Sequence, residues 1–197
     1  MSDNQKIDKT RRNLVIATSV AGGAASVGAA VPFVASMLPS ERAKAAGAPV
    51  EVDISGIAPG EMKIFEWRGK PVWVIRRTKE MVESLKAGTS RLTDPGSKSS
   101  EQPEYAMNEH RSRNPEVMVM EGVCTHLGCS PQIRGTDAKA EMGADWSGGF
   151  YCPCHGSKFD LAGRVFRGAP APTNLPVPPY QFLSDSTLLI GEDNKGA

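Results

Sequence analysis

Two short stretches decide the fold of this chain, Cys124-Thr125-His126-Leu127-Gly128-Cys129 and Cys152-Pro153-Cys154-His155-Gly156-Ser157. They contain all four cysteines and two of the three histidines among 197 residues. In each stretch a cysteine is followed by a histidine two or three residues later, and both residue types are common metal ligands. We therefore expect two loops at strand ends that direct four ligands at one centre, namely Cys124, His126, Cys152 and His155.

Three kinds of metal centre can use two cysteines and two histidines. A structural zinc site is the first, although the sequence lacks the His-x3–5-His spacing of a zinc finger. A mononuclear redox metal such as copper is the second. The third is a two-iron, two-sulfide cluster in which one iron binds both thiolates and the other binds both imidazoles. Each alternative leaves two cysteines, Cys129 and Cys154, outside the ligand set.

Composition narrows the class of protein. The chain is 40% apolar and 23% charged, with a net charge of +1, and it has no basic run, which argues against a nucleic-acid partner. Its 20 glycines and 15 prolines favour many turns and short strands over a helical bundle. Four cysteines indicate metal binding in a cytosolic protein and disulfides in an exported one.

The N-terminal region predicts export and a membrane anchor. Residues 14–38 contain no charge, and a helix of this length, about 37 Å at about 1.5 Å per residue, can cross a bilayer. The pair Arg11-Arg12 before this run is typical of a twin-arginine signal, and the excess of positive charge there favours a cytoplasmic N-terminus. A cleaved signal or a buried helix of a soluble protein are the alternatives.

We expect residues 1–13 to be the cytoplasmic N-terminus and residues 14–38 to be the retained transmembrane anchor. Residues 39–49 read as a hinge, either helical or extended, and residues 50–197 as the exported domain. Within that domain the patterns predict these elements: a strand at 50–54, a hairpin at 61–76, a helix at 78–87, a polar loop at 88–115, a buried strand at 117–120, a strand before Cys152, a strand pair turning at 162–163, and a closing hairpin at 177–190. We expect His110, in the polar loop, to be solvent-exposed.

The two stretches resemble, across their whole length, the paired boxes of the Rieske iron–sulfur proteins. The resemblance implies an all-β fold: a Rieske-type antiparallel β-sandwich head with a small cluster-binding subdomain, its loops within 121–172, plus one N-terminal transmembrane helix. It implies one [2Fe-2S] cluster as cofactor, held by the four candidate ligands. Neutral imidazoles in place of two thiolates leave such a cluster less negative, so that it accepts an electron more readily.

The two remaining cysteines point to one branch of that family. In the quinol-oxidising branch, the positions of Cys129 and Cys154 form a disulfide between the loops, whereas Rieske ferredoxins and ring-hydroxylating oxygenases generally lack this pair. A disulfide requires an oxidising compartment, which agrees with the export signal. The anchor, the hinge and the segment 168–172 also resemble the Rieske subunits of bacterial ubiquinol–cytochrome c reductases.

This resemblance implies that the head accepts an electron from quinol and passes it to a c-type cytochrome, with proton release on the periplasmic side. His155 and His126 would contact the quinol, Leu127 would form an apolar docking rim, and Ser157 would donate a hydrogen bond to a bridging sulfide. The implied partners are a cytochrome b subunit, a c-type cytochrome subunit, ubiquinol and membrane lipid, within a dimeric complex of the bacterial inner membrane. The alternatives are the Rieske subunit of an arsenite oxidase, a soluble Rieske ferredoxin, and a zinc-stabilised exported binding domain.

One residue departs from the mitochondrial pattern of the family. Two positions after the serine, mitochondrial-type members carry a tyrosine whose hydroxyl reaches a ligand cysteine. Phe159 occupies this position here and has no hydroxyl to donate. Because hydrogen bonds to sulfur favour the reduced cluster, we expect a lower midpoint potential than in tyrosine-bearing relatives, partly offset if Lys158 lies close.

Overall fold

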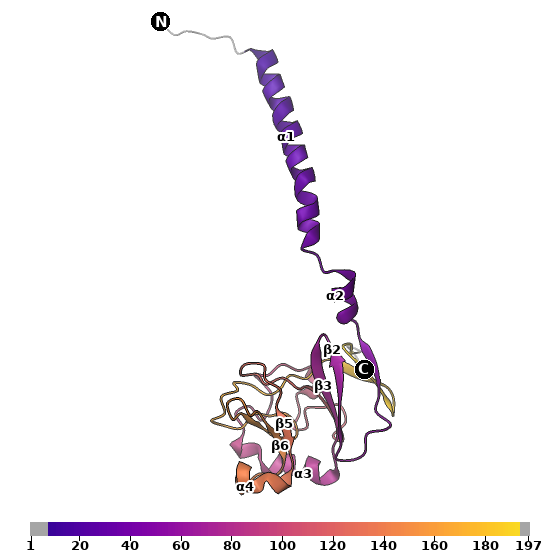
Figure 1. Cartoon of the computed structure of the whole chain (residues 1–197), viewed down its shortest axis with the longest axis vertical. Coiled ribbons are helices and arrows are strands. Elements are labelled where there is room, and N and C mark those ends of the chain that lie inside the picture. The colour runs from indigo at the N-terminus through magenta and orange to yellow at the C-terminus, as the bar shows by residue number, and fades with distance from the viewer. Residues whose placement is uncertain (1–7, 194–197) are drawn as a thin grey trace. The chain divides into compact units, whose positions relative to one another are not determined.

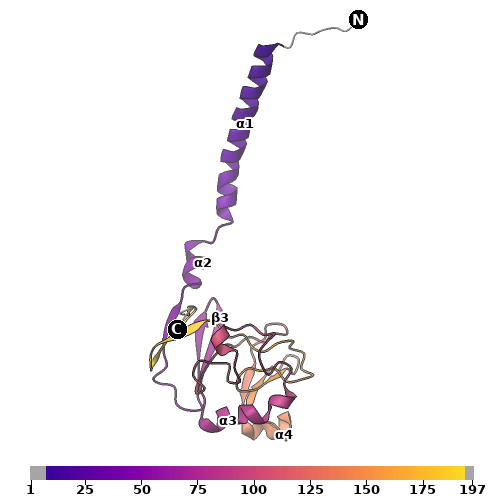
Figure 2. The same cartoon turned by 180° about the vertical axis from the view of Figure 1, so that it is seen from behind.

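The computed structural model describes residues 8–193, which fall into two compact units that meet between Ala45 and Ala46. The first unit is dominated by helix α1 (Lys9–Ser36), shown in Figures 1 and 2. The side chain of Asp8 caps it by accepting a hydrogen bond from the Thr10 amide at 3.0 Å. The helix is apolar enough to span a membrane, with a mean hydropathy of 1.8, and none of its residues is buried.

The anchor helix begins and ends earlier than the uncharged run. It starts at Lys9, so Arg11 and Arg12 belong to its first turn, and it ends at Ser36. The predicted cytoplasmic segment 1–13 lies partly outside the described residues. Within the predicted hinge 39–49, residues Glu41–Ala46 form the short helix α2.

The second unit is a head built from three antiparallel three-stranded sheets, which confirms the all-β expectation (Figure 1). Two of the strand pairs, β2-β3 and β8-β9, are joined by two-residue turns, as antiparallel neighbours allow. The sheets have the orders β1-β9-β8, β2-β3-β4 and β5-β6-β7. Their strands are β1 (Val50–Asp53), β2 (Met62–Trp67), β3 (Lys70–Arg76), β4 (Val117–Glu121), β5 (Gln132–Arg134), β6 (Gly149–Tyr151), β7 (Lys158–Phe159), β8 (Tyr180–Ser184) and β9 (Thr187–Ile190).

The predicted hairpin at 61–76 is confirmed as β2 and β3. Its two-residue turn places Arg68 at φ 54° and Gly69 at φ 70°. Positive φ at both central residues is the conformation of a type I′ turn, which matches the right-handed twist of the two strands. The register then pairs Trp67 with Lys70 and Met62 with Ile75.

Buried side chains of β3 and β4 form the centre of the core of the head. The buried strand predicted at 117–120 is confirmed in β4, whose fifth residue, Glu121, is buried as well. Met118 and Met120 are core residues, and the Trp73 indole stacks at 5.0 Å, centroid to centroid, on Phe150 of β6. This contact joins the β2-β3-β4 sheet to the β5-β6-β7 sheet; one cysteine-containing loop follows β4 and the other follows β6.

One short helix of the head was predicted, and the others were not. The predicted helix at 78–87 is α3 (Lys79–Ala87), which begins where the Thr78 side chain accepts a hydrogen bond from the Met81 amide at 3.3 Å. The further short elements are η1 (Thr89–Arg91), η2 (Glu104–Ala106), η3 (Thr136–Ala138) and α4 (Lys139–Met142).

The predicted strand pair around residues 162–163 is reduced to the two-residue β7 and a single bridge between Phe159 and Val165. The Asp160 carboxylate accepts hydrogen bonds from the amides of Ala162 and Arg164, both at 2.9 Å. These local bonds take the place of ladder bonds and fold the chain into a compact turn.

The segment 88–115 is largely irregular, as the predicted polar loop requires, but several of its side chains are buried. Leu92, Ser97 and Arg111 have no exposed surface, and His110 keeps only 18% of its side chain exposed. The expectation that His110 is solvent-exposed was therefore wrong, because most of its side chain is buried. Burial lowers the pKa of His110, because an imidazolium loses solvation there, while the nearby Glu109 carboxylate acts in the opposite direction.

Candidate functional site

The first cysteine loop leaves the end of β4 and closes on itself. The Cys124 amide donates to the Cys129 carbonyl at 2.8 Å, and the Gly128 amide donates to the Cys124 carbonyl at 2.9 Å. Gly128 has φ 82°, a conformation that is costly for a residue with a Cβ atom. The loop is therefore a tight, hydrogen-bonded turn that presents His126 and Leu127 at its tip.

The second loop, which leaves the end of β6, repeats this geometry. The Cys152 amide donates to the Ser157 carbonyl at 2.8 Å, and the Gly156 amide donates to the Cys152 carbonyl at 2.9 Å. Gly156 has φ 79°, nearly that of its counterpart in the first loop. The two turns are thus equivalent, and both loops share the spacing Cys-x-x-x-Gly.

The two innermost cysteines are free thiols in an apolar pocket. Cys124 and Cys152 are each 2% exposed and belong to the main hydrophobic cluster. Burial raises the pKa of the Cys124 thiol, and the adjacent Cys152 thiol raises it further. Two neighbouring thiols of this kind become thiolates only when a cation compensates their charge, which suits a metal centre.

The two histidines lie on the outer side of the same loops. The rings of His126 and His155 are 4.7 Å apart, centroid to centroid, and nearly perpendicular at 88°. His155 is exposed and His126 is partly buried, whereas both candidate cysteine ligands are buried. Leu127, beside them, is 70% exposed and is the most exposed of the large apolar residues described in the head.

The donor set fits a Rieske cluster. Two buried thiols adjoin each other and two imidazoles adjoin each other, so the sulfur and nitrogen donors are segregated. This is the arrangement that a two-iron centre with one thiolate-bound iron and one imidazole-bound iron requires. The site residues predicted from the sequence are thus brought together as a group.

The remaining cysteines form a disulfide between the loops, Cys129 to Cys154. The sulfur of Cys152 lies within 4.8 Å of both disulfide sulfurs, so the three could be mistaken for a metal-binding group. However, the ligand is the thiolate, and neither sulfur of a disulfide can ionise. The bond therefore closes the two loops beside the candidate ligand Cys152.

A third loop, residues 168–175, packs against both cysteine loops. The Ala171 amide donates to the Ser157 hydroxyl at 3.0 Å, and the Thr125 hydroxyl donates to the Thr173 carbonyl at 2.7 Å. Because Ser157 accepts from Ala171, its own hydrogen remains free to point at the neighbouring Cys124 sulfur. Sequence reasoning identified Ser157 but missed Thr125, whose only signal was its place between two ligands.

The positions after Ser157 behave differently from each other. Phe159 has no exposed surface and shares the hydrophobic cluster of Cys124 and Cys152, as expected for a core residue. The Lys158 ammonium donates to the Met142 carbonyl at 2.8 Å. It is therefore engaged with α4, and this contact competes with any direct interaction between Lys158 and the cluster ligands.

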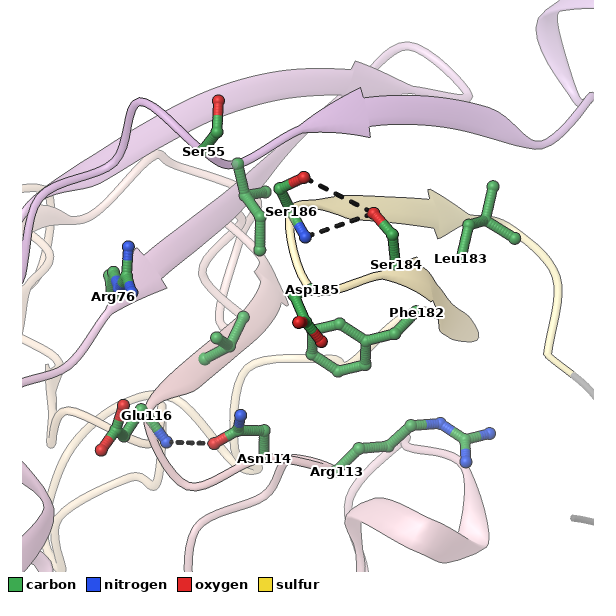
Figure 3. A pocket seen from close by; sticks show the side chains of 12 residues that line it. Ser55, Arg76, Arg113, Asn114, Glu116, Phe182, Leu183, Ser184, Asp185 and Ser186 are labelled. Carbon is green, nitrogen blue, oxygen red and sulfur yellow. Dashed lines mark hydrogen bonds between the residues drawn. The ribbon is translucent and has the colours of Figure 1, made fainter.

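A separate pocket of about 740 Å³ lies at the β8–β9 turn (Figure 3). The side chains around it include Arg76, Arg113, Glu116, Phe182 and Asp185, which mix both signs of charge with an aromatic ring. None of the four candidate ligands lines this pocket. The paired loops, and not this hollow, are therefore the candidate site.

Comparison with known proteins gives consistent matches. Residues 50–180 match the family described as the Rieske [2Fe-2S] domain, and residues 1–40 match the twin-arginine (TAT) signal of the ubiquinol–cytochrome c reductase Fe-S subunit. The chain is 54% identical to the ubiquinol–cytochrome c reductase iron–sulfur subunit of Allochromatium vinosum, covering 98% of this chain and 94% of that protein. It is 43% identical to the subunit of the same name from Bradyrhizobium diazoefficiens, covering 92% and 94%, respectively. For the Blastochloris viridis subunit the identity is 40%, covering 97% and 98%.

Proposed function

The chain belongs to the Rieske family as an iron–sulfur subunit of ubiquinol–cytochrome c reductase that carries one [2Fe-2S] cluster, and on this premise we propose which residues hold the cluster and meet the quinol. The observation that carries the proposal is the pair of equivalent loops with buried thiols inside and imidazoles outside. The relatives are ubiquinol–cytochrome c reductase subunits, so the arsenite oxidase and ferredoxin alternatives are not retained.

We assign Cys124 and Cys152 as ligands of one iron and His126 and His155 as ligands of the other. When bound, the cluster supplies one-electron chemistry. Ser157 donates its hydroxyl hydrogen toward sulfur, because its lone pair already accepts from the Ala171 amide. A hydrogen bond of this kind favours the more negative, reduced form.

The exposed imidazole of His155 is our choice for the quinol contact. A metal-bound imidazole leaves its second nitrogen free, and at an exposed position this nitrogen can accept a hydrogen bond from a quinol hydroxyl and then hold the proton. His126, which is less exposed, would contribute in the same way. Leu127 would seat the tip of the head in an apolar pocket of the partner, since its 70% exposure leaves an apolar side chain to be covered.

The twin-arginine signal and the apolar helix α1 are those of a bacterial Rieske protein anchored in the membrane. We propose that the N-terminus faces the cytoplasm, that the head lies in the periplasm and that the proton is released there. Residues 39–49 would let the head move between a cytochrome b subunit, where ubiquinol is oxidised, and a c-type cytochrome subunit, within a dimeric complex. Protease added to spheroplasts should then remove the head while leaving α1 in the membrane.

Electron paramagnetic resonance of the dithionite-reduced, full-length chain tests the ligand assignment. We expect a Rieske-type signal in the wild type and its loss in His155→Gln and Cys124→Ser. His110→Gln is the matched control, because His110 is remote from the loops and its substitution should leave the signal intact. A normal signal in either ligand variant would overturn the assignment, and copurification with b- and c-type haem tests the proposed partners separately.

A further inference from the structure

The segment 88–115, which we call the strap, is built into the head although its composition is polar. The Thr93 amide donates to the Val165 carbonyl at 3.0 Å, and the Val177 amide donates to the Glu101 carbonyl at 3.0 Å. Val165 precedes the loop 168–175 in the chain and Val177 follows it, so the two bonds join the strap to the chain on both sides of this loop. The strap therefore runs along the chain that contacts both cysteine loops.

Asp94 organises the part of the strap nearest this loop. Its carboxylate accepts hydrogen bonds from the amides of Lys98 and Ser99, at 2.8 Å and 2.9 Å, and from the Ser100 hydroxyl at 2.9 Å. Partial burial raises the pKa of Asp94, but these hydrogen bonds outweigh it, so that the pKa of Asp94 lies below its ordinary value. The carboxylate thus stays ionised and fixes residues 94–100 as a rigid turn.

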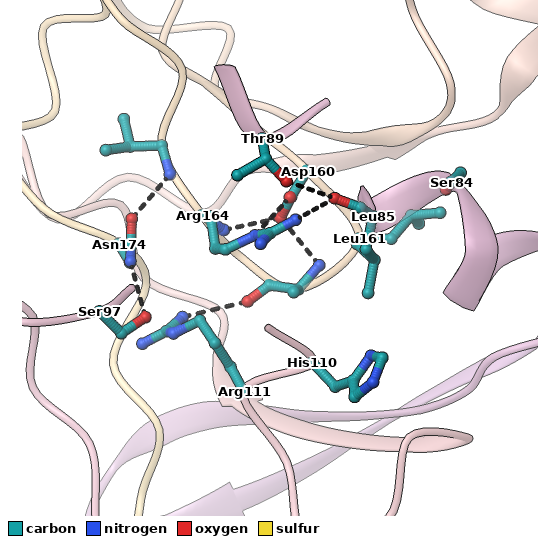
Figure 4. A network of polar contacts seen from close by, with 12 residues as sticks. Ser84, Leu85, Thr89, Ser97, His110, Arg111, Asp160, Leu161, Arg164 and Asn174 are labelled. Carbon is teal, nitrogen blue, oxygen red and sulfur yellow. Dashed lines mark hydrogen bonds and ion pairs between the residues drawn. The ribbon is translucent and has the colours of Figure 1, made fainter. Parts of the chain in front are cut away.

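Asn174 connects this turn to the loop. It has no exposed surface, and its side-chain amide donates to the Asp94 carbonyl at 2.9 Å and to the Ser97 hydroxyl at 3.0 Å. Its side-chain oxygen accepts from the Val165 amide at 2.9 Å. Its own backbone amide donates to the Ser100 hydroxyl at 3.1 Å. Figure 4 shows the Asn174 side chain beside Ser97, deep in this network.

Two residues close to Asn174 in the chain form hydrogen bonds with the two cysteine loops. Thr173, directly before it, gives its carbonyl to the Thr125 hydroxyl of the first loop. Ala171, three residues before it, gives its amide to the Ser157 hydroxyl of the second loop. A buried side chain with three satisfied hydrogen bonds holds its backbone in one position. It therefore also holds the nearby Thr173 carbonyl and Ala171 amide in place against their partners in the two loops.

We propose that Asn174 is a positioning residue for the cluster: it transmits the rigidity of the Asp94 turn to the loop 168–175 and so keeps the Ser157 hydroxyl aimed at sulfur. The hydrogen bonds of Asn174 go to Asp94, Ser97, Ser100 and Val165, and none goes to a candidate ligand. It acts by fixing the Ala171 amide, which orients Ser157. The strap, in turn, is the support on which the third loop of the cluster site rests. This inference depends on the ligand set proposed above.

The test compares Asn174→Ala with a matched control, Asn108→Ala, in the full-length, cluster-loaded chain. Asn108 is also in the strap, and its side chain makes a comparable set of bonds, to the Tyr105 and Ser112 carbonyls at 2.9 Å and from the His110 amide at 3.0 Å. Its partners do not include the loop 168–175. Both variants should lose stability, but only Asn174→Ala should lower the midpoint potential and change the shape of the electron paramagnetic resonance signal.

Hydrogen–deuterium exchange provides a readout that is independent of electron transfer. In Asn174→Ala, peptides from residues 168–175 should exchange about tenfold faster or more, because the Ala171 amide is no longer held against the Ser157 hydroxyl. Ser100→Ala removes the acceptor of the Asn174 backbone amide and one donor to the Asp94 carboxylate, but it leaves the Asn174 side chain in place. It should give smaller shifts in the same direction, and it keeps the test available if Asn174→Ala does not fold.

An unchanged potential and unchanged exchange in both Asn174→Ala and Ser100→Ala would overturn the inference. So would an equal change of potential in Asn108→Ala, since the effect would then be a general loss of stability. If the wild-type chain itself gave no Rieske signal, the ligand assignment would fail instead, and the two failures are thereby distinguished.

Discussion

Replacing Phe159 by tyrosine should raise the midpoint potential of the cluster. The ring of Phe159 is fully buried in the hydrophobic cluster that contains Cys124 and Cys152, so an added hydroxyl would enter an environment with few competing partners. If that hydroxyl donates to a ligand sulfur, it stabilises the reduced form, which carries one more negative charge, more than the oxidised form.

The expected magnitude follows from the energy of such a hydrogen bond. A net gain of about 1 kcal/mol in the reduced form relative to the oxidised form is typical for a buried neutral donor. Since about 1.4 kcal/mol corresponds to a tenfold change in the equilibrium constant, and hence to about 59 mV for one electron, the potential should rise by about 40 mV.

Protein-film voltammetry measures this shift directly, and thermal unfolding provides the second half of the test. A buried hydroxyl without a partner costs about 1–3 kcal/mol of stability, whereas a satisfied one costs much less. Phe166→Tyr is the control, because Phe166 packs against Trp146 at 5.9 Å and not against the cysteines. No upward shift in Phe159→Tyr, together with a loss of stability, would refute the reasoning, because the hydroxyl would then have found no sulfur.

Three further changes test the packing and charges around the loops. Gly122→Ala should lower the free energy of unfolding by about 1–3 kcal/mol in a urea titration, because its Cβ atom would collide with the Trp73 indole. Replacing Cys129 and Cys154 together by serine should lower it by about 3–4 kcal/mol, measured by thermal unfolding, because the disulfide closes a loop with a sequence separation of 25. Asp94→Asn should flatten the acid limb of the stability profile: the folded pKa of Asp94 is depressed, so its contribution is present above the ordinary value of 3.8 and is lost as the pH falls through the folded pKa.

Gly122→Ala has a matched control, and each of the three expectations has an outcome that would contradict it. Gly88→Ala is the control for Gly122→Ala, because Gly88 has φ −89° and its new Cβ atom would meet its nearest neighbour at an ordinary 3.6 Å. Equal losses in both variants would remove the indole as the cause. The disulfide argument fails if the double serine variant unfolds at the wild-type temperature. The Asp94 argument fails if the difference in the free energy of unfolding between wild type and Asp94→Asn is the same at pH 3 and at pH 6.

Much of the head was predictable because its signals are local. The hairpin at 61–76 is specified by its two-residue turn, α3 by the Thr78 cap, and β4 by an uninterrupted apolar run. The short β5 (Gln132–Arg134) was missed, because three residues with little burial carry no periodicity. The pairing of β1 with β9 joins the two ends of the head, and alternation within each strand contains no information about its partner.

The sequence by itself determined the candidate ligands, since cysteines and histidines that cluster in two matched loops have few other uses. Only the tertiary structure decided the role of the strap. The sequence predicts only a polar loop there, because it does not show whether a strap residue such as Ser97 will meet water or the buried side chain of Asn174. Buried polar groups are stable only when distant segments satisfy them, and those segments meet only in the folded chain.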